Sequence, residues 1–494
     1  MTNYNINELK MKRKFKIPNI LSMATAILLM MPACNSSYPG IEYEPNPDDQ
    51  PSNEEDITVE KTPIKIYTDT PGFFSITNGT NTRGTGAFEE GDIAKYLNTT
   101  FHVFAFRTGV GEDGMGGQPP LTEPVNLQRS AYSTNKSQAD PDNRSCLLDG
   151  EDYNIGMPFK FIPDENSQEL KSLQAQVDYP LYYSGSYQDV GYSFFGYHID
   201  DFEPTAANTH RNDSEIYYDI DIDGSRDILL GYAEPLKKED FINDEATNIK
   251  GAYADLKLSN EEVDRILEMH GGYSSYSGHR LVNPIIKMKH QLTRIKFEAY
   301  PGDNSASNVK ITGISVCAPK KAKMVVAGRR LSDVRFEPYY KEKYSEDADE
   351  ICLSEAADEV GKPCPGHLRS EGYTVQWEDY MKDVPALQRP MTQIGSSLML
   401  APCKTYDLYL SYTFTKADGE EKHFKAHYVI QAPKNDGLSY DPTTGTNMFM
   451  PGIQYNIKIA VFGLQDIQIS AAVSGWKEEK DPIVVDPDQN PDYQ

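Results

Sequence analysis

The chain has 494 residues, more than one compact core usually organises, so we expect two or three domains. Charged residues make up 25% and hydrophobic residues 38% of the sequence, which argues against a polytopic membrane protein and against a largely disordered chain. The formal net charge of −26 argues against nucleic-acid binding, because an acidic surface repels phosphate backbones. The 32 tyrosines, 35 glycines and 32 prolines predict a β-rich chain with many turns.

The N-terminus has the parts of a bacterial export signal. Basic residues gather in Met11–Lys16, and the following segment Ile20–Met31 is apolar apart from a serine and a threonine. This apolar segment falls short of the ~20 residues that cross a membrane, so a permanent transmembrane helix is disfavoured. We therefore expect residues 1–33 to be a signal peptide, whose true start is either Met1 or Met11.

Residues 29–34 resemble a lipobox, the motif in which a small residue precedes the cysteine that becomes lipidated. Ala33 supplies the small residue before Cys34, whereas Pro32 departs from the small residue that is usual at its position. We expect a lipid such as palmitate on Cys34 to be the membrane anchor; the alternative is a buried or disulfide-bonded cysteine. The segment 34–56 is rich in proline, asparagine and acidic residues and is expected to be a tether.

The remaining cysteines predict at most a partial set of disulfides. They are Cys146, Cys317, Cys352, Cys364 and Cys403. Cys352 and Cys364 enclose a short loop and could pair in an oxidising compartment, but an odd number of cysteines leaves at least one thiol unpaired in the monomer. Because the sequence contains no C-x-x-C pair, a zinc ribbon and a thioredoxin-like site are unsupported.

The first half of the mature chain carries strand periodicity and one helix signal. Apolar residues alternate with polar neighbours in Ile57–Thr68, and strand periodicity resumes in Phe101–Ala105. Ser259 and Glu262 form a capping box ahead of an apolar stripe that ends before Gly272, which predicts a short helix.

The second half of the chain alternates more regularly. The predicted strands are Thr293–Ala299, Tyr406–Phe414, Phe424–Ile430, Ile453–Val461 and Ile467–Val473. Asp418 and Gly419 predict a hairpin turn between the second and the third of these strands. Short alternating strands separated by turns predict antiparallel β-sandwiches. We place the two domains at 84–283 and 284–476, followed by an acidic extension at 477–494.

Three motif-like patterns are better explained without a ligand. Gly109–Gly114 matches G-x-G-x-x-G, but no helix follows it, so we expect a mobile loop. Asp219–Gly224 looks like the start of an EF-hand loop, yet Leu230 stands where a glutamate should bind calcium, which favours a strand ending in a turn. His423 and His427 would lie about 13 Å apart on a strand, too far to share a zinc ion. We expect no catalytic residues, no metal site and no cofactor.

Several segments, taken in their order along the chain, carry a resemblance to a known family. They are the lipobox at Cys34, Thr82–Gly84, Phe101–Phe106, Asp227–Ala233, Lys289–Phe297, Pro451–Ile457 and Trp476. Together they resemble the fimbrillin family, the lipoprotein precursors of type V pili of Bacteroidetes. The resemblance covers nearly the whole mature chain.

The resemblance implies an all-β fold of two tandem transthyretin-like antiparallel β-sandwich domains with short helical insertions, exported to the outer membrane and the cell surface. It implies that a trypsin-like protease cuts between Arg83 and Gly84, so that residues 57–83 hold a removable first strand. A strand from another pilus subunit would then fill the groove. Arg83 is the only arginine between Cys34 and Arg107, and the alternative is that it is merely a loop residue.

The C-terminal extension bears on the position of the subunit in a pilus. Ile483, Val484 and Val485 are its only apolar patch and are the candidate donor strand. Since a stalk subunit needs such a donor, this short patch favours a tip or accessory subunit. The expected partners are other pilus subunits, the outer membrane, the protease and, at a tip, ligands on host or bacterial surfaces. The alternative is a surface glycan-binding lipoprotein, which would need exposed tyrosine or tryptophan.

Overall fold

The computed structural model describes only part of the chain, and every structural statement below concerns that part. The described residues are 62–69, 99–108, 127, 146–149, 155–164, 167–176, 181–183, 191–244, 249–268, 272–340, 350–352, 372–433, 439–462 and 468–474. The chain divides into the units Met1–Glu55 and Asp56–Gln494, and all described residues belong to the second unit. No helix in the described part is long and apolar enough to cross a membrane.

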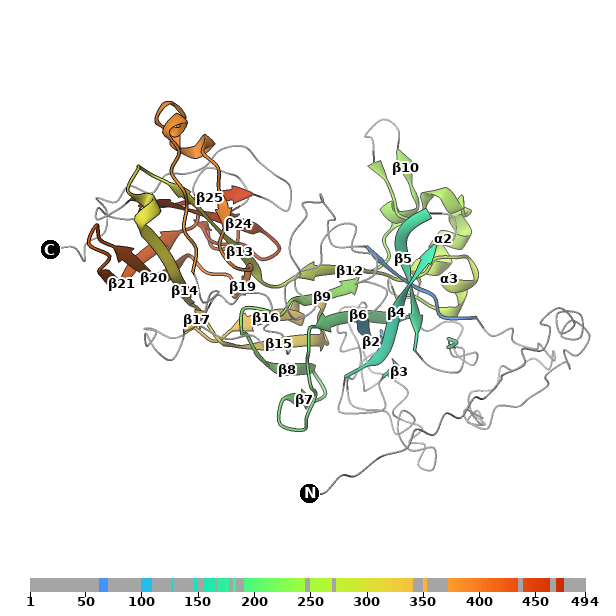
Figure 1. Cartoon of the computed structure of the whole chain (residues 1–494). Helices are drawn as coiled ribbons and strands as arrows, with labels where there is room; N and C mark the ends of the chain where they lie inside the picture. Colours follow the sequence, from blue (N-terminus) through green and yellow to red (C-terminus); the bar gives the residue numbers. More distant parts are fainter. Residues whose placement is uncertain are drawn as a thin grey trace, which may run out of the picture. The chain divides into compact units, whose positions relative to one another are not determined.

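The pairing of the first sheet closes into a ring, and its labelled strands lie in the right half of Figure 1. Its members are β1 (Ile66–Asp69), β2 (Thr100–Arg107), β3 (Cys146–Leu148), β4 (Met157–Asp164), β5 (Ser167–Ala175), β6 (Tyr192–Ile199), β9 (Ile228–Ala233) and β12 (Ile285–His290). The order is β3-β2-β4-β5-β1-β12-β9-β6, and a further pairing of β2 with β6 closes the ring, with β3 attached to β2 outside it. Within this sheet only β1 and β12 pair in parallel; the other described pairings are antiparallel.

The second sheet joins strands that lie far apart in the sequence. It has the order β16-β15-β8-β7 and is built from β7 (Thr209–Arg211), β8 (Glu215–Asp221), β15 (Lys321–Gly328) and β16 (Arg335–Pro338). The domain boundary between residues 283 and 284 stays a prediction. Pairing between strands crosses it at three places, because β12 pairs with β1 and with β9, and β15 pairs with β8.

Two further sheets enclose the apolar residues of the second half. One contains β13 (Thr293–Pro301), β18 (Thr392–Gln393), β19 (Leu398–Leu400), β24 (Gln454–Val461) and β25 (Gln468–Ser474), and the other β14 (Val309–Cys317), β17 (Glu350–Cys352), β20 (Thr405–Thr415) and β21 (Glu421–Gln431). Phe297 and Ile457 of the first share one buried cluster with Ile311 and Leu408 of the second. Two sheets that share a core form a β-sandwich, so the all-β prediction is confirmed.

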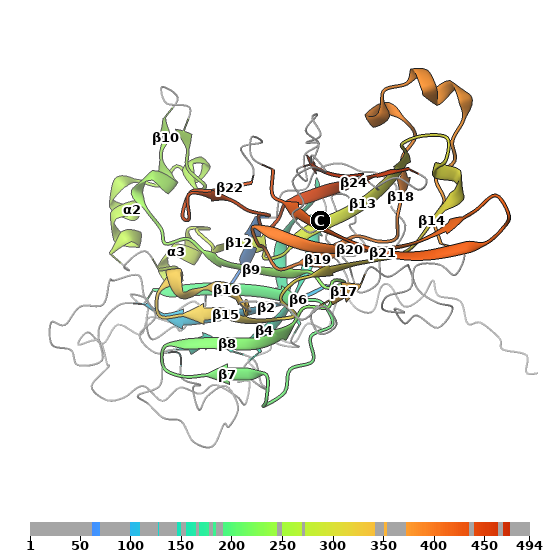
Figure 2. The same cartoon turned by 90° about the vertical axis from the view of Figure 1, so that its left-hand side faces the viewer.

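The hairpin predicted around Asp418 and Gly419 is present as β20 and β21 (Figure 2). Gly419 has φ +86°, a left-handed conformation that side chains rarely adopt, which explains the glycine at the turn. Two small hairpins complete the described strands: β10 (Asn243–Asp244) with β11 (Ile249–Lys250), and β22 (Tyr440–Asp441) with β23 (Thr446–Asn447).

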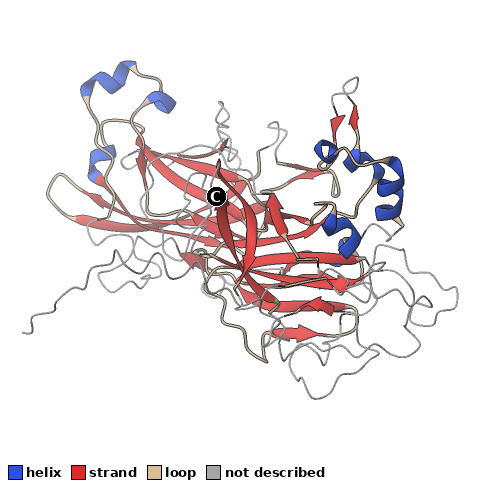
Figure 3. Cartoon of the chain, turned by 90° about the vertical axis from the view of Figure 1, so that its right-hand side faces the viewer, coloured by secondary structure: helices blue, strands red, loops and turns tan. Residues whose placement is uncertain are grey.

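Helices are short insertions between the strands (Figure 3). The described α-helices are α2 (Asn260–Leu267) and α3 (Ser275–His279), and the 3-10 helices are η3 (Lys238–Phe241), η4 (Ala254–Leu256), η5 (Ala306–Asn308), η6 (Leu331–Asp333), η7 (Asp379–Asp383) and η8 (Ala386–Gln388). The capping box predicted for Ser259 and Glu262 is confirmed, because each side chain bonds the other residue's backbone N–H at the start of α2. Val263 and Ile266 bury one face of this helix.

Two buried clusters share the strands β2, β6 and β9. The ring cluster includes Ile66, Phe101, Phe194, Leu229 and Met288, and the central cluster includes Phe104, Phe195, Tyr197, Tyr218, Ile228, Phe297 and Ile457. Successive residues of β6 therefore enter different clusters, and the strand is buried along its whole length. A strand that is covered on both faces reads as a continuous apolar run rather than as an alternation.

His102 on β2 predicts a measurable loss of stability in acid. Its ring stacks on Tyr197 at 5.3 Å. Burial, with a contribution from the neighbouring His198, lowers the pKa of His102 from 6.5 to about 4. Since the folded state holds this ring neutral while the unfolded chain protonates it below pH 6.5, stability is lost as the pH falls from about 6.5 to about 4.

We expect His102→Gln to reduce this loss by up to about 3 kcal/mol, since each pKa unit is worth about 1.4 kcal/mol. Chemical denaturation of both proteins across this pH range measures the effect. An identical pH dependence in the variant would contradict the prediction.

Candidate functional site

β1 lies between two neighbouring strands, and we call residues 62–69 the guest strand because another strand could take their place. Tyr67 pairs with Ser172 of β5 on one side and with Ile285 of β12 on the other. The N–H of Tyr67 also donates to the carbonyl oxygen of Pro284 at 2.9 Å. We call this site, formed by β5, residues 181–183 and residues 284–287 around residues 62–69, the β1 slot (blue strand in Figure 1).

The backbone ahead of β1 is paired as well. The N–H of Ile64 donates to the carbonyl oxygen of Leu181 at 2.9 Å, and the N–H of Tyr183 donates to that of Thr62 at 3.0 Å. Pro63 lies opposite Tyr182 between these bonds, and a proline fits there because no N–H is needed. The slot therefore holds residues 62–69 mainly through main-chain groups, which another strand could supply.

The side chains of the guest strand alternate between the core and solvent. Thr62, Ile66 and Thr68 are 2%, 1% and 3% exposed, whereas Pro63 and Lys65 are exposed. The alternation predicted for this segment is thus confirmed in its described part. Ile66 packs into the ring cluster, and burying one such side chain stabilises the fold by roughly 1.5–3 kcal/mol.

No tight turn joins β1 to either neighbour. In sequence, β2, β3 and β4 lie between β1 and β5, and many more elements lie between β1 and β12. Parallel pairing with β12 requires such a long connection. A single cut between residues 69 and 99 would therefore separate β1 covalently from every other described strand and leave its pairing intact.

Helix α3 closes the start of the slot. The Thr62 and Ser275 hydroxyls form a hydrogen bond of 2.6 Å, and both residues are buried. A Cβ atom on Gly278 would lie 2.9 Å from the Thr62 methyl group and 3.1 Å from the Tyr183 ring, so only glycine leaves room for Thr62.

Two buried carboxylate–imidazole pairs support the wall of the slot. His198 bonds Asp200 at 2.8 Å, and His290 bonds Asp227 at 2.9 Å, with both carboxylates fully buried. The backbone N–H of Asp227 donates to Asp200 at 3.1 Å and joins the two pairs. These contacts tie the ends of β6, β9 and β12 together. Sequence reasoning missed them, because no spacing in the sequence signals residues that meet only through strand pairing.

The segment Asp219–Gly224 is a strand and a turn, as the alternation predicted. Tyr218, Ile220 and Ile222 are buried, and Asp219 and Asp223 face away from them. One carboxylate oxygen of Asp219 accepts from the Tyr339 hydroxyl at 3.1 Å, and the other oxygen pairs with His210 at 2.9 Å. Asp223 accepts from the backbone N–H of Ser225 in the turn. The carboxylates of Asp219 and Asp223 therefore bind different partners within the protein and do not converge on one point. Within the described ranges no group of three or more His, Cys, Asp or Glu side chains is placed to hold a metal ion.

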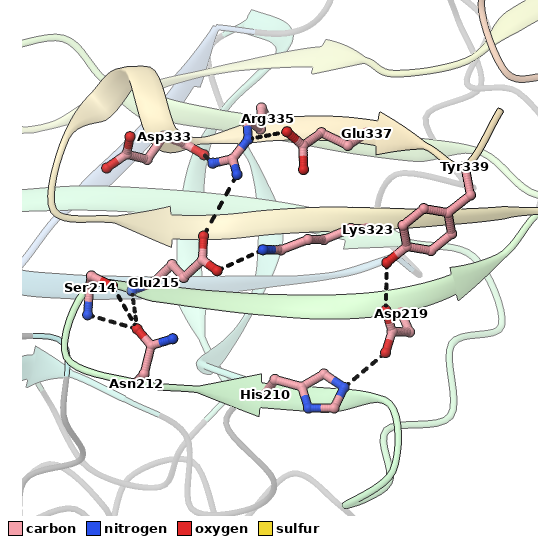
Figure 4. A network of polar contacts seen from close by, with 10 residues as sticks. All are labelled: His210, Asn212, Ser214, Glu215, Asp219, Lys323, Asp333, Arg335, Glu337 and Tyr339. Atoms are coloured by element: carbon pink, nitrogen blue, oxygen red, sulfur yellow. Dashed lines mark hydrogen bonds and ion pairs between the residues drawn. The ribbon is translucent and has the colours of Figure 1, made fainter.

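A polar network covers the solvent-facing side of the second sheet (Figure 4). Glu215 on β8 bonds Lys323 on β15 at 2.6 Å and lies 3.8 Å from Arg335 on β16. Arg335 also bonds Glu337 at 2.6 Å. Because charges of opposite sign lie on neighbouring strands, the network stabilises the pairing across the predicted domain boundary. Its groups have protein partners, which argues for a structural role.

The two histidines of β21 have different partners. His423 contacts the Thr413 hydroxyl at 3.0 Å, and His427 pairs with Asp407 at 2.7 Å. Both residues lie on β21, so the prediction that they sit on a strand is confirmed. Cys403 lies near the start of the same hairpin as a free thiol that donates to the carbonyl oxygen of Thr405 at 2.8 Å.

Several residues singled out in the sequence lie outside the described ranges. They are Cys34, Arg83, Gly84, Gly109–Gly114, Cys364, Trp476, Ile483, Val484 and Val485, together with the side chains of Cys146 and Cys352. The predictions of lipidation, cleavage, donor strand and the Cys352–Cys364 disulfide therefore stay predictions.

The exposed tyrosines of the described part lie in four separate segments of the chain. They are Tyr182, Tyr339, Tyr340, Tyr380 and Tyr440, at 39%, 49%, 55%, 52% and 51% exposure. Tyr197, Tyr218, Tyr406 and Tyr455 are by contrast almost fully buried. A sugar platform needs several exposed rings on one surface, so core packing accounts better for the aromatic residues in the described part.

The chain matches no protein-family model and no curated protein. It is similar to a solved candidate cell adhesion protein of Bacteroides uniformis, with 10% identity and a TM-score of 0.37 over 84% of this chain and 99% of that one. It is also similar to a candidate cell adhesion protein of Bacteroides ovatus, with 10% identity and a TM-score of 0.36 over 85% of this chain and 100% of that one. The similarity to the fimbrial anchor protein Mfa2 of Porphyromonas gingivalis has 12% identity and a TM-score of 0.24 over 85% of this chain and 99% of that one. At these values we base the function on the chain's own residues.

Proposed function

We propose that the protein is a structural or adhesive subunit of a fimbrillin-type pilus on the bacterial cell surface, with a tip or accessory position favoured over the stalk. A lipid on Cys34 would hold the precursor at the outer membrane. The protein acts by assembly rather than by catalysis. Protease-triggered donor-strand exchange would replace residues 62–69 with a strand from another subunit.

The observation that supports this proposal most is the way β1 is held. It lies between β5 and β12, buries Ile66 and Thr68, and is joined to neither neighbour by a turn. Without β1, the facing edges of β5 and β12 would offer backbone donors, acceptors and apolar surface to any strand of matching pattern. Arg83 lies between β1 and β2 in the sequence, where a cut would free β1 covalently.

Replacing Arg83 by alanine is expected to abolish assembly while leaving the precursor folded. The strand would stay covalently linked and compete with any incoming strand at an effective concentration of about millimolar or above. Wild type and Arg83→Ala are treated with the same trypsin-like protease and examined on native gels for polymers or heterocomplexes.

A second arginine provides the control. Arg129 follows β2 in the sequence, so cutting there would not separate β1 from β2, and Arg129→Ala is expected to assemble like wild type. Equal assembly of Arg83→Ala and wild type would overturn the proposal.

A further inference from the structure

The start of the β1 slot makes a side-chain contact that strand addition by itself does not require. The hydroxyl groups of Thr62 and Ser275 bond at 2.6 Å in a position where both residues are at most 3% exposed. Main-chain bonds to residues 62, 64 and 67 do not depend on the side chains of the guest strand. Position 62 is therefore one position at which the slot recognises the side chain of its occupant, and not only its backbone.

The wall at this position is small and rigid. The Ser274 and Ser277 side chains close a capping box at the start of α3, and both serines are fully buried. The N–H of Gly278 donates to the carbonyl oxygen of Ser274 at 2.9 Å, which sets the distance from this glycine to Thr62. A Cβ atom on Gly278 would approach the Thr62 methyl group to 2.9 Å, so the absence of a side chain at position 278 is what leaves space for this methyl group.

The residue at position 62 of the inserted strand determines whether the Ser275 hydroxyl keeps its hydrogen-bond partner. A valine matches threonine in size but leaves the buried Ser275 hydroxyl without this partner. An aspartate would bring a charge into a site that is 2% exposed, with a single hydroxyl facing it. Threonine fits both the hydroxyl and the methyl contact.

Over residues 62–66 the chain's own C-terminal extension matches β1 at each inward position except this one, and at the next inward position Pro487 would stand where Thr68 stands. When Asp481–Val485 is aligned with residues 62–66, Pro482 matches Pro63, Ile483 matches Ile64, and Val485 matches Ile66. Asp481 stands where Thr62 stands. The apolar pattern of the extension thus suits the slot, and its first residue does not.

We propose that Ser275 and Gly278 select incoming strands that carry threonine at the position of Thr62, and that they select against the C-terminal extension of a second copy of this chain. The preferred partner is a strand of pattern Thr-x-apolar-x-apolar that runs parallel to β12. Rejection by a buried mismatch is a common route to specificity. This inference rests on the proposed function, because it names the strand that the slot accepts.

The test uses the full chain with a specific protease site inserted after Arg83. The cut protein is mixed with an excess of synthetic peptides, and native mass spectrometry measures their capture. One peptide has the sequence of residues 62–69, a second carries Thr62→Val, and a third carries the outward change Lys65→Ala as a control. Wild type should favour the first peptide over the second about tenfold, and capture the third like the first. In Ser275→Ala the preference for threonine over valine should disappear.

A second comparison uses the extension itself. A peptide of residues 481–488 should bind poorly, and Asp481→Thr in that peptide should raise its capture about tenfold or more. Capture of all peptides with equal affinity would overturn this inference and leave the proposed function standing. If no peptide exchanges with β1, the proposed function and this inference both fail.

Discussion

Ile66→Asp is expected to make the protein lose its first strand once the chain is cut after Arg83. Ile66 is 1% exposed and packs in the ring cluster with Leu173 and Ile286. Removing its side chain and burying a carboxylate should weaken the docking of β1 by about 4 kcal/mol or more, roughly a thousandfold in affinity. Before cutting, the covalent link holds the strand near the slot and masks much of this effect.

Native mass spectrometry of the cut protein measures whether the N-terminal fragment stays bound. Lys65→Asp is the matched control, because it introduces the same side chain at the adjacent exposed position. The fragment should stay bound in wild type and Lys65→Asp and dissociate in Ile66→Asp. If it stays bound in all three proteins, residues outside 62–69 hold it and the slot is not the main site of docking.

The largest loss of stability from a single methyl group is expected at Gly231. A Cβ atom there would lie 2.0 Å from the carbonyl oxygen of Lys287 and 2.6 Å from its carbonyl carbon. Both are backbone atoms of β12, so the paired strands β9 and β12 would have to separate. We expect Gly231→Ala to lower the free energy of unfolding by about 3 kcal/mol or more. Since β12 is one wall of the β1 slot, capture of β1 should weaken as well.

Gly419→Ala serves as the comparison for this effect. Gly419 has φ +86° at an open turn, and a methyl group added there would have no atom within 4 Å, so only backbone strain of about 1 kcal/mol is expected. Thermal unfolding should therefore give the order wild type, Gly419→Ala, Gly231→Ala, from the highest midpoint to the lowest. A midpoint for Gly231→Ala at or above that of Gly419→Ala would show that β9 and β12 do not approach as closely as described.

The sequence predicted those strands whose environment repeats every second residue. In β13, β20 and β24 one face meets the core and the other meets polar surroundings, so the alternation is local and visible in the sequence. The hairpin turn at Gly419 and the cap at Ser259 are likewise set by residues close in sequence. Local steric and hydrogen-bonding preferences are sufficient to predict such features.

The tertiary structure alone decided which elements meet. Ile66 reads as an inward residue in the sequence, but its place between β5 and β12 depends on pairing with residues more than a hundred positions away. The same holds for the contact of Thr62 with Ser275 and for the meeting of Asp227 with His290. β6 is buried on both faces, which hides its alternation. Pairing between distant strands depends on the whole fold, so the sequence predicted the strands with one buried face, and their neighbours became clear only in the folded chain.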